Sequence, residues 1–262
     1  MSGKTAVITG GASGLGEACA RRLAADGAMV WLADDNLELA EKVAADIAAN
    51  GGKARAIHAD VASEASLAGC AETVARETGA PDILITSAGI LERTASVLDM
   101  DMEAHDRVWS VNYRGTVLAC RMFGRMMREA GSGAIVTIGS INSFAALPLP
   151  AYCPSKTAIL RVTELLAVEL GRHGVRVNGI APTYVLTPAM LARIDAGERD
   201  PAVLRGSGAI DMFVMPHHIA DVAAFLCSDA AAAVTGVMMP VDSGWRAATT
   251  YKSFAGGVPW KE

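Results

Sequence analysis

The chain has 262 residues, of which 52% are hydrophobic and 19% are charged, and its formal net charge is −5. This composition excludes a disordered chain, provides enough apolar residues for a large core and, without a long basic run, argues against a nucleic-acid partner. No apolar run approaches the ~18 residues of a membrane span and no secretory signal is evident, so we expect a cytoplasmic protein without membrane contacts.

Short β-branched runs alternate along the chain with longer helical patterns. Most of the short runs are almost continuously apolar, as expected of parallel strands that helices cover on both faces. The predicted strands are Thr5–Thr9, Met29–Ala33, Ala54–Ala59, Ile83–Thr86, Ala134–Ile138, Arg176–Ile180 and Val237–Val241. Helical patterns lie between them, for example at Leu15–Asp26 and Leu37–Asn50. This alternation predicts an α/β fold, with residues 1–262 as one doubly wound Rossmann-type domain around a seven-stranded parallel sheet.

A glycine-rich segment of the pattern Gly-x-x-x-Gly-x-Gly follows the first predicted strand and precedes a helix. Glycines allow a sharp turn and a close approach of the backbone to a ligand, and the helix N-terminus offers unpaired N–H groups. These features together predict a site for a pyrophosphate, although an ordinary glycine-rich turn is the simpler alternative. The residues expected at the ligand are Gly10, Ser13, Gly14, Leu15 and Gly16.

Two carboxylates, Asp34 and Asp35, follow the second predicted strand. An acidic side chain about 20 residues past the glycines can accept hydrogen bonds from ribose hydroxyls and would repel a 2′-phosphate. We expect Asp34 at the ribose, and Asp35 or Asn36 at the start of the next helix. No Arg or Lys lies between Gly10 and Gly16 to favour an additional phosphate. The charges therefore predict NAD in preference to NADP.

Tyr152 and Lys156 stand four residues apart where a helical pattern begins, and Pro154 is tolerated there only in the first turn. A phenol with its ordinary pKa of ~10 is a poor general base at neutral pH, and a nearby ammonium group lowers that pKa. Lys156 can also hydrogen-bond the nicotinamide ribose. The pair predicts an acid/base tyrosine, and the alternative is an amphipathic helix with a surface lysine.

Four features follow one another along the chain: the glycine turn, Asn112, Ser140 and the Tyr152/Lys156 pair. From about Lys4 to Gly244 the chain resembles the classical short-chain dehydrogenase/reductase family. The resemblance implies an oxidoreductase that transfers a hydride between nicotinamide and a secondary alcohol or ketone. It implies that Tyr152 exchanges the proton, Lys156 lowers the pKa of Tyr152, Ser140 polarises the substrate oxygen and Asn112 anchors a water in a proton relay.

The same resemblance assigns further positions around the cofactor and the substrate. It places Asp60 and Val61 at the adenine, Ala88 and Gly89 beside the adenosine ribose, and Pro182, Val185 and Thr187 near the nicotinamide carboxamide. Asn142 and Tyr184 are expected at the substrate together with Ser140 and Tyr152.

Three positions depart from the family pattern. Thr86 and Ser87 stand where the family usually has two asparagines, which changes the local hydrogen bonding. Thr183 replaces a glycine after Pro182, and because a β-branched residue does not easily adopt a positive φ, this loop should run differently. Ser140 lies twelve residues before Tyr152, one fewer than the common spacing, and the alternative alignments use Gly139 or Ser143.

Two segments break the alternation of strands and helices. Residues 183–215 are mixed in polarity and irregular, and we interpret them as a mobile substrate lid with flexible points at Gly197, Gly206 and Gly208. The tail, residues 246–262, contains Tyr251, Phe254 and Trp260, which would form an apolar patch in water. We expect the tail to pack on a neighbouring subunit of a two-fold symmetric homotetramer, and a frayed terminus is the alternative.

The sequence leaves two rival functions open. An NADPH-dependent 3-oxoacyl-thioester reductase of the same family conflicts with Asp34, and a non-catalytic dinucleotide-binding regulator would not need all four catalytic residues. His217 and His218 follow Pro216 and are expected at a helix start.

The five cysteines are dispersed, and no cluster predicts a disulfide or a metal site. The identity of the alcohol stays open among sugars, polyols, hydroxy acids and steroid-like compounds.

Overall fold

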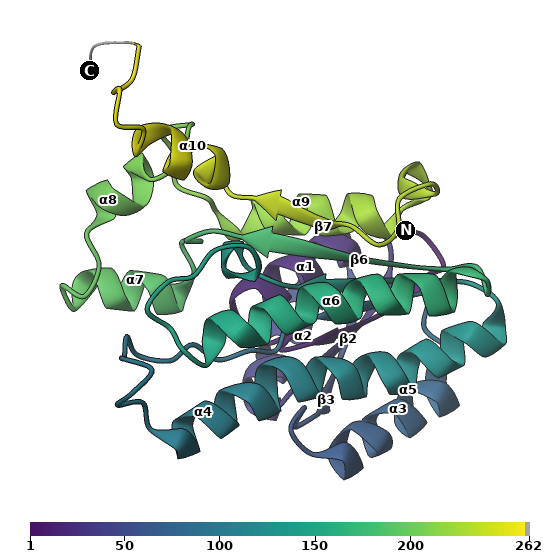
Figure 1. The fold of residues 1–262 in the computed structure, drawn as a ribbon. Coiled ribbons are helices and arrows are strands. Elements are labelled where there is room, and N and C mark those ends of the chain that lie inside the picture. Colours follow the sequence, from purple (N-terminus) through teal and green to yellow (C-terminus); the bar gives the residue numbers. More distant parts are fainter. Residues whose placement is uncertain (260–262) are drawn as a thin grey trace.

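The computed structural model describes residues 1–259 of the chain. Within this range, seven parallel strands form one sheet in the order β3-β2-β1-β4-β5-β6-β7 (Figure 1). The strands are β1 (Thr5–Thr9), β2 (Met29–Asp34), β3 (Lys53–His58), β4 (Ile83–Thr86), β5 (Gly133–Ile138), β6 (Val175–Pro182) and β7 (Met238–Val241). The predicted sheet is confirmed, and every predicted strand end lies within two residues of its observed position.

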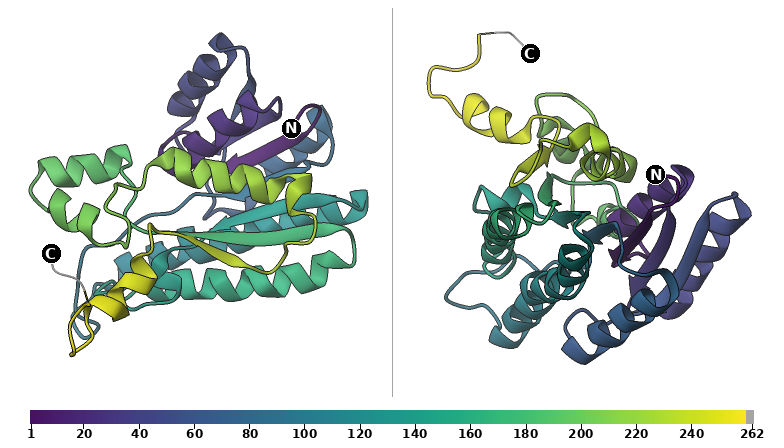
Figure 2. Two further views of the ribbon diagram at one scale, coloured as in Figure 1. Left: turned by 90° about the horizontal axis from the view of Figure 1, so that it is seen from above. Right: turned by 90° about the vertical axis from the view of Figure 1, so that its right-hand side faces the viewer.

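Helices cover both faces of the sheet, so that it lies between two apolar layers (Figure 2). One face packs against α1 (Gly14–Ala25), α2 (Leu37–Ala49) and α9 (Pro216–Cys227), and the other against α3 (Glu64–Thr78), α5 (Gly115–Ala130) and α6 (Tyr152–Gly171). Neighbouring strand residues serve opposite layers, because side chains alternate along a strand. In β1, Ile8 packs in the first layer and Val7 in the second.

The chain changes direction across the sheet after β3. The first three strands extend from β1 to one edge, and the next strand, β4, pairs with β1 on its other side. The carboxyl ends of β1 and β4 are neighbours, with Thr9 opposite Thr86. At such a switch point the connections leave in opposite directions, and a crevice opens between them at the carboxyl ends of the strands.

The proposed lid, residues 183–215, is more regular than predicted. It contains α7 (Pro188–Asp195) and α8 (Pro201–Gly206), which begin with side-chain caps from Thr187 and Asp200. The prediction of an irregular segment was therefore wrong. The helices escaped notice because a helix of about two turns is too short to show a clear apolar period. Neither helix is well anchored by apolar packing, because α7 has no buried residue and α8 buries only Leu204.

The first part of the tail is a helix, α10 (Trp245–Lys252), which begins shortly after β7. Trp245 is buried, and Lys252 Nζ donates hydrogen bonds to the carbonyls of Gly206 and Gly208 at 2.8 and 3.0 Å. Residues 245–252 therefore form a helix that contacts the lid. Packing on a neighbouring subunit stays a prediction, and Trp260 lies outside the described residues. None of the helices that the structure describes is long and apolar enough to cross a membrane.

Candidate active site

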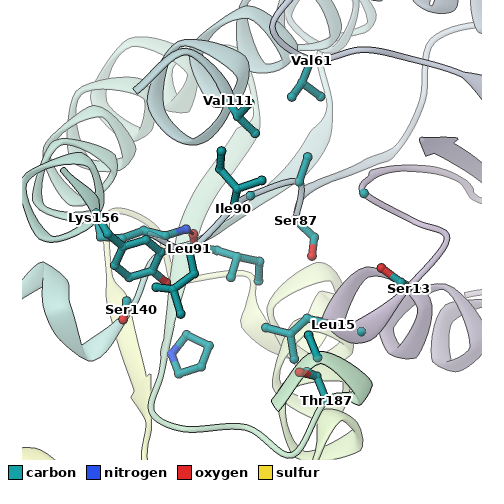
Figure 3. Close-up of a pocket in the computed structure, with 18 of the residues that line it drawn as sticks. Ser13, Leu15, Val61, Ser87, Ile90, Leu91, Val111, Ser140, Lys156 and Thr187 are labelled. Carbon is teal, nitrogen blue, oxygen red and sulfur yellow. Dashed lines mark hydrogen bonds between the residues drawn. The ribbon is translucent and has the colours of Figure 1, made fainter. Parts of the chain in front are cut away.

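A cavity of about 1350 Å³ occupies the crevice at the carboxyl ends of the strands (Figure 3). Most of the predicted site residues line it: Gly10, Ser13, Gly14, Leu15, Asp34, Asp60, Val61, Ala88, Gly89, Ser140, Tyr152, Lys156, Pro182, Val185 and Thr187. Four others are not among its lining residues: Gly16, Asn112, Asn142 and Tyr184. The fold thus gathers side chains from the whole length of the chain around one cavity.

The glycine turn at the start of α1 leaves no space for side chains at two positions. A Cβ on Gly16 would lie 1.9 Å from the carbonyl oxygen of Gly10, and a Cβ on Gly10 would lie 2.7 Å from the backbone of Ala88. Gly10 also has a φ of 66°, a conformation that favours glycine. Gly16 therefore acts through close packing of the turn, while Gly10, Ser13 and Gly14 form the cavity wall. This cradle fits the phosphates of a dinucleotide.

Asp34 ends β2 at the cavity, and both of its carboxylate oxygens are held by backbone donors. Oδ2 accepts from the N–H of Ala12 at 3.0 Å, and Oδ1 accepts from the N–H of Asn36 at 3.0 Å. Each oxygen keeps capacity for a further donor. Asn36, one of the two expected caps, accepts from Leu39 N and begins α2. Asp34 is thereby fixed beside the glycine turn in the cavity wall, and its contact with a ribose stays a prediction.

Ser140, Tyr152 and Lys156 lie together where β5 ends and α6 begins. Ser140 Oγ accepts from the N–H of Asn142 and donates to Asn142 Oδ1, both at 3.1 Å, and it is hydrogen-bonded to the side chain of Tyr152. Lys156 Nζ donates to the carbonyl of Ile138 at 2.8 Å and lies 5.4 Å from the centroid of the Tyr152 ring. One turn of α6 thus presents the phenol and the ammonium group side by side.

Burial has opposite effects on the two ionisable groups of this cluster. It raises the pKa of Tyr152 to about 12, against a smaller lowering by the hydrogen bond with Ser140. It lowers the pKa of Lys156 to about 8. Both shifts have one cause, because a site shielded from water disfavours a charge of either sign. The phenol is thereby kept protonated at neutral pH, and the expected lowering of its pKa by Lys156 stays a prediction.

Asn112 lies in a π-helical turn (Ser110–Arg114) that joins α4 (Met102–Trp109) to α5. Its side chain is fully buried and contacts both polar groups of one residue in the loop after β4. Oδ1 accepts from the N–H of Ile90 at 2.8 Å, and Nδ2 donates to the carbonyl of Ile90 at 2.9 Å. In this structure Asn112 clamps that loop, and its place in a proton relay stays a prediction.

The structure shows the surroundings of the three positions that depart from the family pattern. Thr86 Oγ1 is buried and has no hydrogen-bond partner among the described residues. Ser143 donates to the carbonyl of Lys156 at 2.7 Å and does not line the cavity, which supports Ser140 as the serine of the site. Ser243 is the one non-glycine residue with a positive φ in the described part of the chain, so Thr183 forms its loop without that conformation, as expected from its branched side chain.

Two predicted substrate residues lie outside the cavity wall. Asn142 is buried against Ser140, and its Nδ2 donates to Cys153 Sγ at 2.9 Å. Tyr184 follows β6 and is not itself a lining residue, although its neighbours Thr183 and Val185 line the cavity. Their contact with a substrate stays a prediction.

Sequence reasoning missed several residues of the cavity wall. Ile90 and Leu91 in the loop after β4, Arg107 in α4 and Arg193 in α7 all line it. They belong to no motif. Ile90 and Leu91 directly follow Gly89, and Arg193 lies in the helix that begins after Thr187, whereas no predicted site residue is near Arg107 in the sequence except Asn112. In the residues that the structure describes, no group of His, Cys, Asp and Glu side chains could hold a metal ion.

Comparison with known proteins agrees with this geometry. Residues 10–246 match the model of a family described as enoyl-(acyl carrier protein) reductase. The chain is also 40% identical over 246 residues to the D-threitol dehydrogenase of Mycolicibacterium smegmatis, covering 94% of each protein. The chain belongs to the short-chain dehydrogenase/reductase family. It is thus an oxidoreductase of a family that binds nicotinamide dinucleotides.

Solved structures match over almost the whole chain. One is an NAD⁺-bound xylitol dehydrogenase, with a TM-score of 0.87, 31% identity and coverage of 93% of this chain and 99% of the other. Another, described as ribose-5-phosphate isomerase from Brucella melitensis, has a TM-score of 0.91, 37% identity and coverage of 99% and 98%. Since proteins of the same shape bear the names of different reactions, the reaction of this chain must be argued from its site.

Proposed function

We propose that this chain is an NAD(H)-dependent dehydrogenase/reductase of secondary alcohols and ketones, with Tyr152 as its acid/base. One observation carries the proposal: Ser140, Tyr152 and Lys156 line the same cavity as the glycine turn and Asp34. A hydride acceptor and a proton acceptor are the two requirements of alcohol oxidation.

The residues around the cavity fit a dinucleotide. The turn at Gly10–Gly16 would hold the pyrophosphate, Asp34 the adenosine ribose and Lys156 the nicotinamide ribose. When bound, the nicotinamide supplies or accepts the hydride. A 2′-phosphate near Asp34 and Asp35, which both line this wall, would meet two negative charges, and this supports NAD over NADP.

The protein residues would transfer a proton to or from the substrate oxygen while a hydrogen bond holds that oxygen in place. Ser140 would donate its hydroxyl proton to the substrate oxygen instead of to Asn142 Oδ1, and would thereby stabilise negative charge that develops on that oxygen. In the reducing direction Tyr152 gives its proton to that oxygen, and in the oxidising direction it takes the proton from the alcohol. The raised pKa of Tyr152 suits the acid role, because the phenol carries its proton at neutral pH.

A polyol is the first substrate class to assay. Two similar proteins bear names that refer to polyols, D-threitol and xylitol. The test is a panel of polyols, cyclic alcohols, hydroxy acids and 3-hydroxyacyl thioesters, each with NAD or NADP, followed by absorbance of the reduced cofactor. We expect turnover of an alcohol with NAD. Turnover of thioesters alone with NADP would replace this proposal by the reductase alternative.

We further propose a homotetramer in the cytoplasm. The outer face of α6 exposes Leu165 to 61% and Val168 to 73%, and a two-fold interface would bury such residues. None of the five cysteines, all of which lie in the described residues, forms a disulfide, as is usual in a reducing compartment.

A further inference from the structure

The N-terminus of α6, which carries Tyr152, is capped by a side chain from a distant loop. Oε1 of Glu92 accepts from the N–H of Ala151 and from the N–H of Tyr152, both at 2.7 Å. These contacts span 59 and 60 residues of sequence. Ala151 itself, the residue before the helix, has no side chain that could provide a cap.

This contact completes the hydrogen bonding of the first turn of α6. A helix leaves its first N–H groups without partners inside the helix. Here Cys153 donates to the carbonyl of Leu149 at 3.0 Å, Pro154 has no N–H, and Ser155 donates to the carbonyl of Ala151 at 3.2 Å. The N–H of Tyr152 is the remaining group, and Glu92 receives it. A carboxylate also suits this place because the helix N-terminus is the positive end of its dipole.

The loop that carries Glu92 is fixed at its other end by Asn112. Asn112 holds both backbone polar groups of Ile90, and Glu92 binds the start of α6 two residues later. Leu91, between these attachments, is 40% exposed and lines the cavity. Figure 3 shows Leu91 beside Lys156, with Ile90 between Leu91 and Val111 in this view. Residues 90–92 thus link Asn112 to the backbone of Tyr152, two of the predicted catalytic residues, and Leu91 between the two attachments faces the cavity.

We propose that Glu92 is a positioning residue, which fixes the phenol of Tyr152 through the first turn of α6 and holds Leu91 against the substrate. The inference rests on the proposed function, since it requires Tyr152 to be the acid/base. Glu92 contacts the backbone of Tyr152 and not its hydroxyl, so it takes no proton from the substrate. Its effect arises from placement, and misplacement of a reacting group by about 1 Å can cost on the order of 100-fold in rate.

The first test is a series of variants of the full-length protein. Glu92→Ala should lower kcat about 10- to 100-fold, with the Kd for NADH within about two-fold of wild type. Glu92→Gln should recover most of that loss, because its amide oxygen can accept the same two hydrogen bonds. Glu92→Asp keeps the charge but has a shorter reach, so it should be slow, and it serves as the test if Glu92→Ala folds poorly. Full kcat in Glu92→Asp and Glu92→Ala would overturn the proposal, as would a Glu92→Gln variant as slow as Glu92→Ala.

Ser63→Ala is the matched control. Ser63 Oγ caps α3 by accepting from Ser66 N at 3.2 Å, and no residue of α3 lines the cavity. Its loss should lower Tm and leave kcat unchanged, whereas Glu92→Ala should change both. Hydrogen exchange of a peptide that contains residues 151–152 should become faster in Glu92→Ala alone. Equal kcat in the two variants would show that Glu92 has only a structural role.

A double variant separates failure of this inference from failure of the proposed function. If Tyr152→Phe keeps only a small residual turnover, adding Glu92→Ala should not lower that residual rate further, because the group that Glu92 positions is gone. A further loss of the same size as in the wild-type background would overturn the positioning role alone. An active Tyr152→Phe variant would instead overturn the proposed function.

Discussion

The two ends of the cavity are constructed differently. At the cofactor end, the glycine turn and Asp34 lie within 25 residues of one another, and the contact between Ala12 and Asp34 joins the turn after β1 to the end of β2. At the substrate end, the wall comes from the loop after β4, the start of α6 and the lid, which are far apart in sequence. The glycine turn and Asp34 are thus set within one βαβ unit, whereas the substrate end depends on contacts between loops. One family can keep its cofactor chemistry and still change its substrate, because the two ends rest on different parts of the chain.

The largest expected effect on turnover is at Tyr152, which lies where the cofactor end and the substrate end of the cavity meet. Tyr152→Phe should lower turnover by about 10²- to 10⁴-fold, since the proton transfer loses its acid/base. NADH binding, measured by fluorescence titration, should stay close to wild type, because the ring and Lys156 remain. A variant that keeps more than a tenth of wild-type turnover would contradict the role of Tyr152.

The cofactor end is tested by reversing its charge. Asp34→Ala combined with Asp35→Arg should narrow or reverse the preference for NAD, because the carboxylate beside the ribose is replaced by a cation nearby. The measurement is kcat/KM with NAD and with NADP. Asp35→Ala alone should narrow the preference less than the double variant, since the Asp35 side chain is 82% exposed and Asp34 keeps its contacts. Equal efficiency of the unmodified protein with both cofactors would remove the basis of this prediction.

The substrate end should respond to changes far from the chemistry. Truncation after Arg246 removes most of α10, including the contacts of Lys252 with Gly206 and Gly208. We expect a higher KM for the alcohol or a weaker tetramer, measured by kinetics and light scattering. An unchanged tetramer with unchanged kinetics would contradict a structural role of the tail, and a monomeric full-length protein at micromolar concentration would contradict the predicted assembly.

The smallest effect is expected at a single contact of the lid. Lys252→Ala should increase hydrogen exchange around residues 206–210, because two carbonyl contacts are lost, while exchange in α7 changes less. Lys42→Ala, which removes an exposed ion pair with Glu38 on α2, is the control. Substrate together with NADH should slow exchange across residues 184–215 in the wild type. Exchange that is equally slow with and without ligands would contradict a mobile lid.

Several features followed from the sequence because they depend on neighbouring residues. Apolar runs located every strand, and the glycines and Asp34 were found from their positions beside strand ends. Tyr152 and Lys156 share a face because the spacing of an α-helix requires it. In each case a local backbone preference, or burial of a short segment on both faces, leaves a pattern that can be recognised in the sequence alone.

Other features were decided only by the tertiary structure. Nothing near Glu92 indicates that it caps a helix 60 residues away, and nothing near Asn142 indicates that its side chain turns to Ser140 and Cys153. The clamp of Asn112 on Ile90 and the contact of Lys252 with the lid likewise join segments that only the closed fold brings together. Such contacts depend on where the sheet places two loops, and no local pattern of residues records that placement. The sequence by itself therefore determined the strands, the glycine turn and the shared helix face of Tyr152 and Lys156, and tertiary packing decided how the loops are held around them.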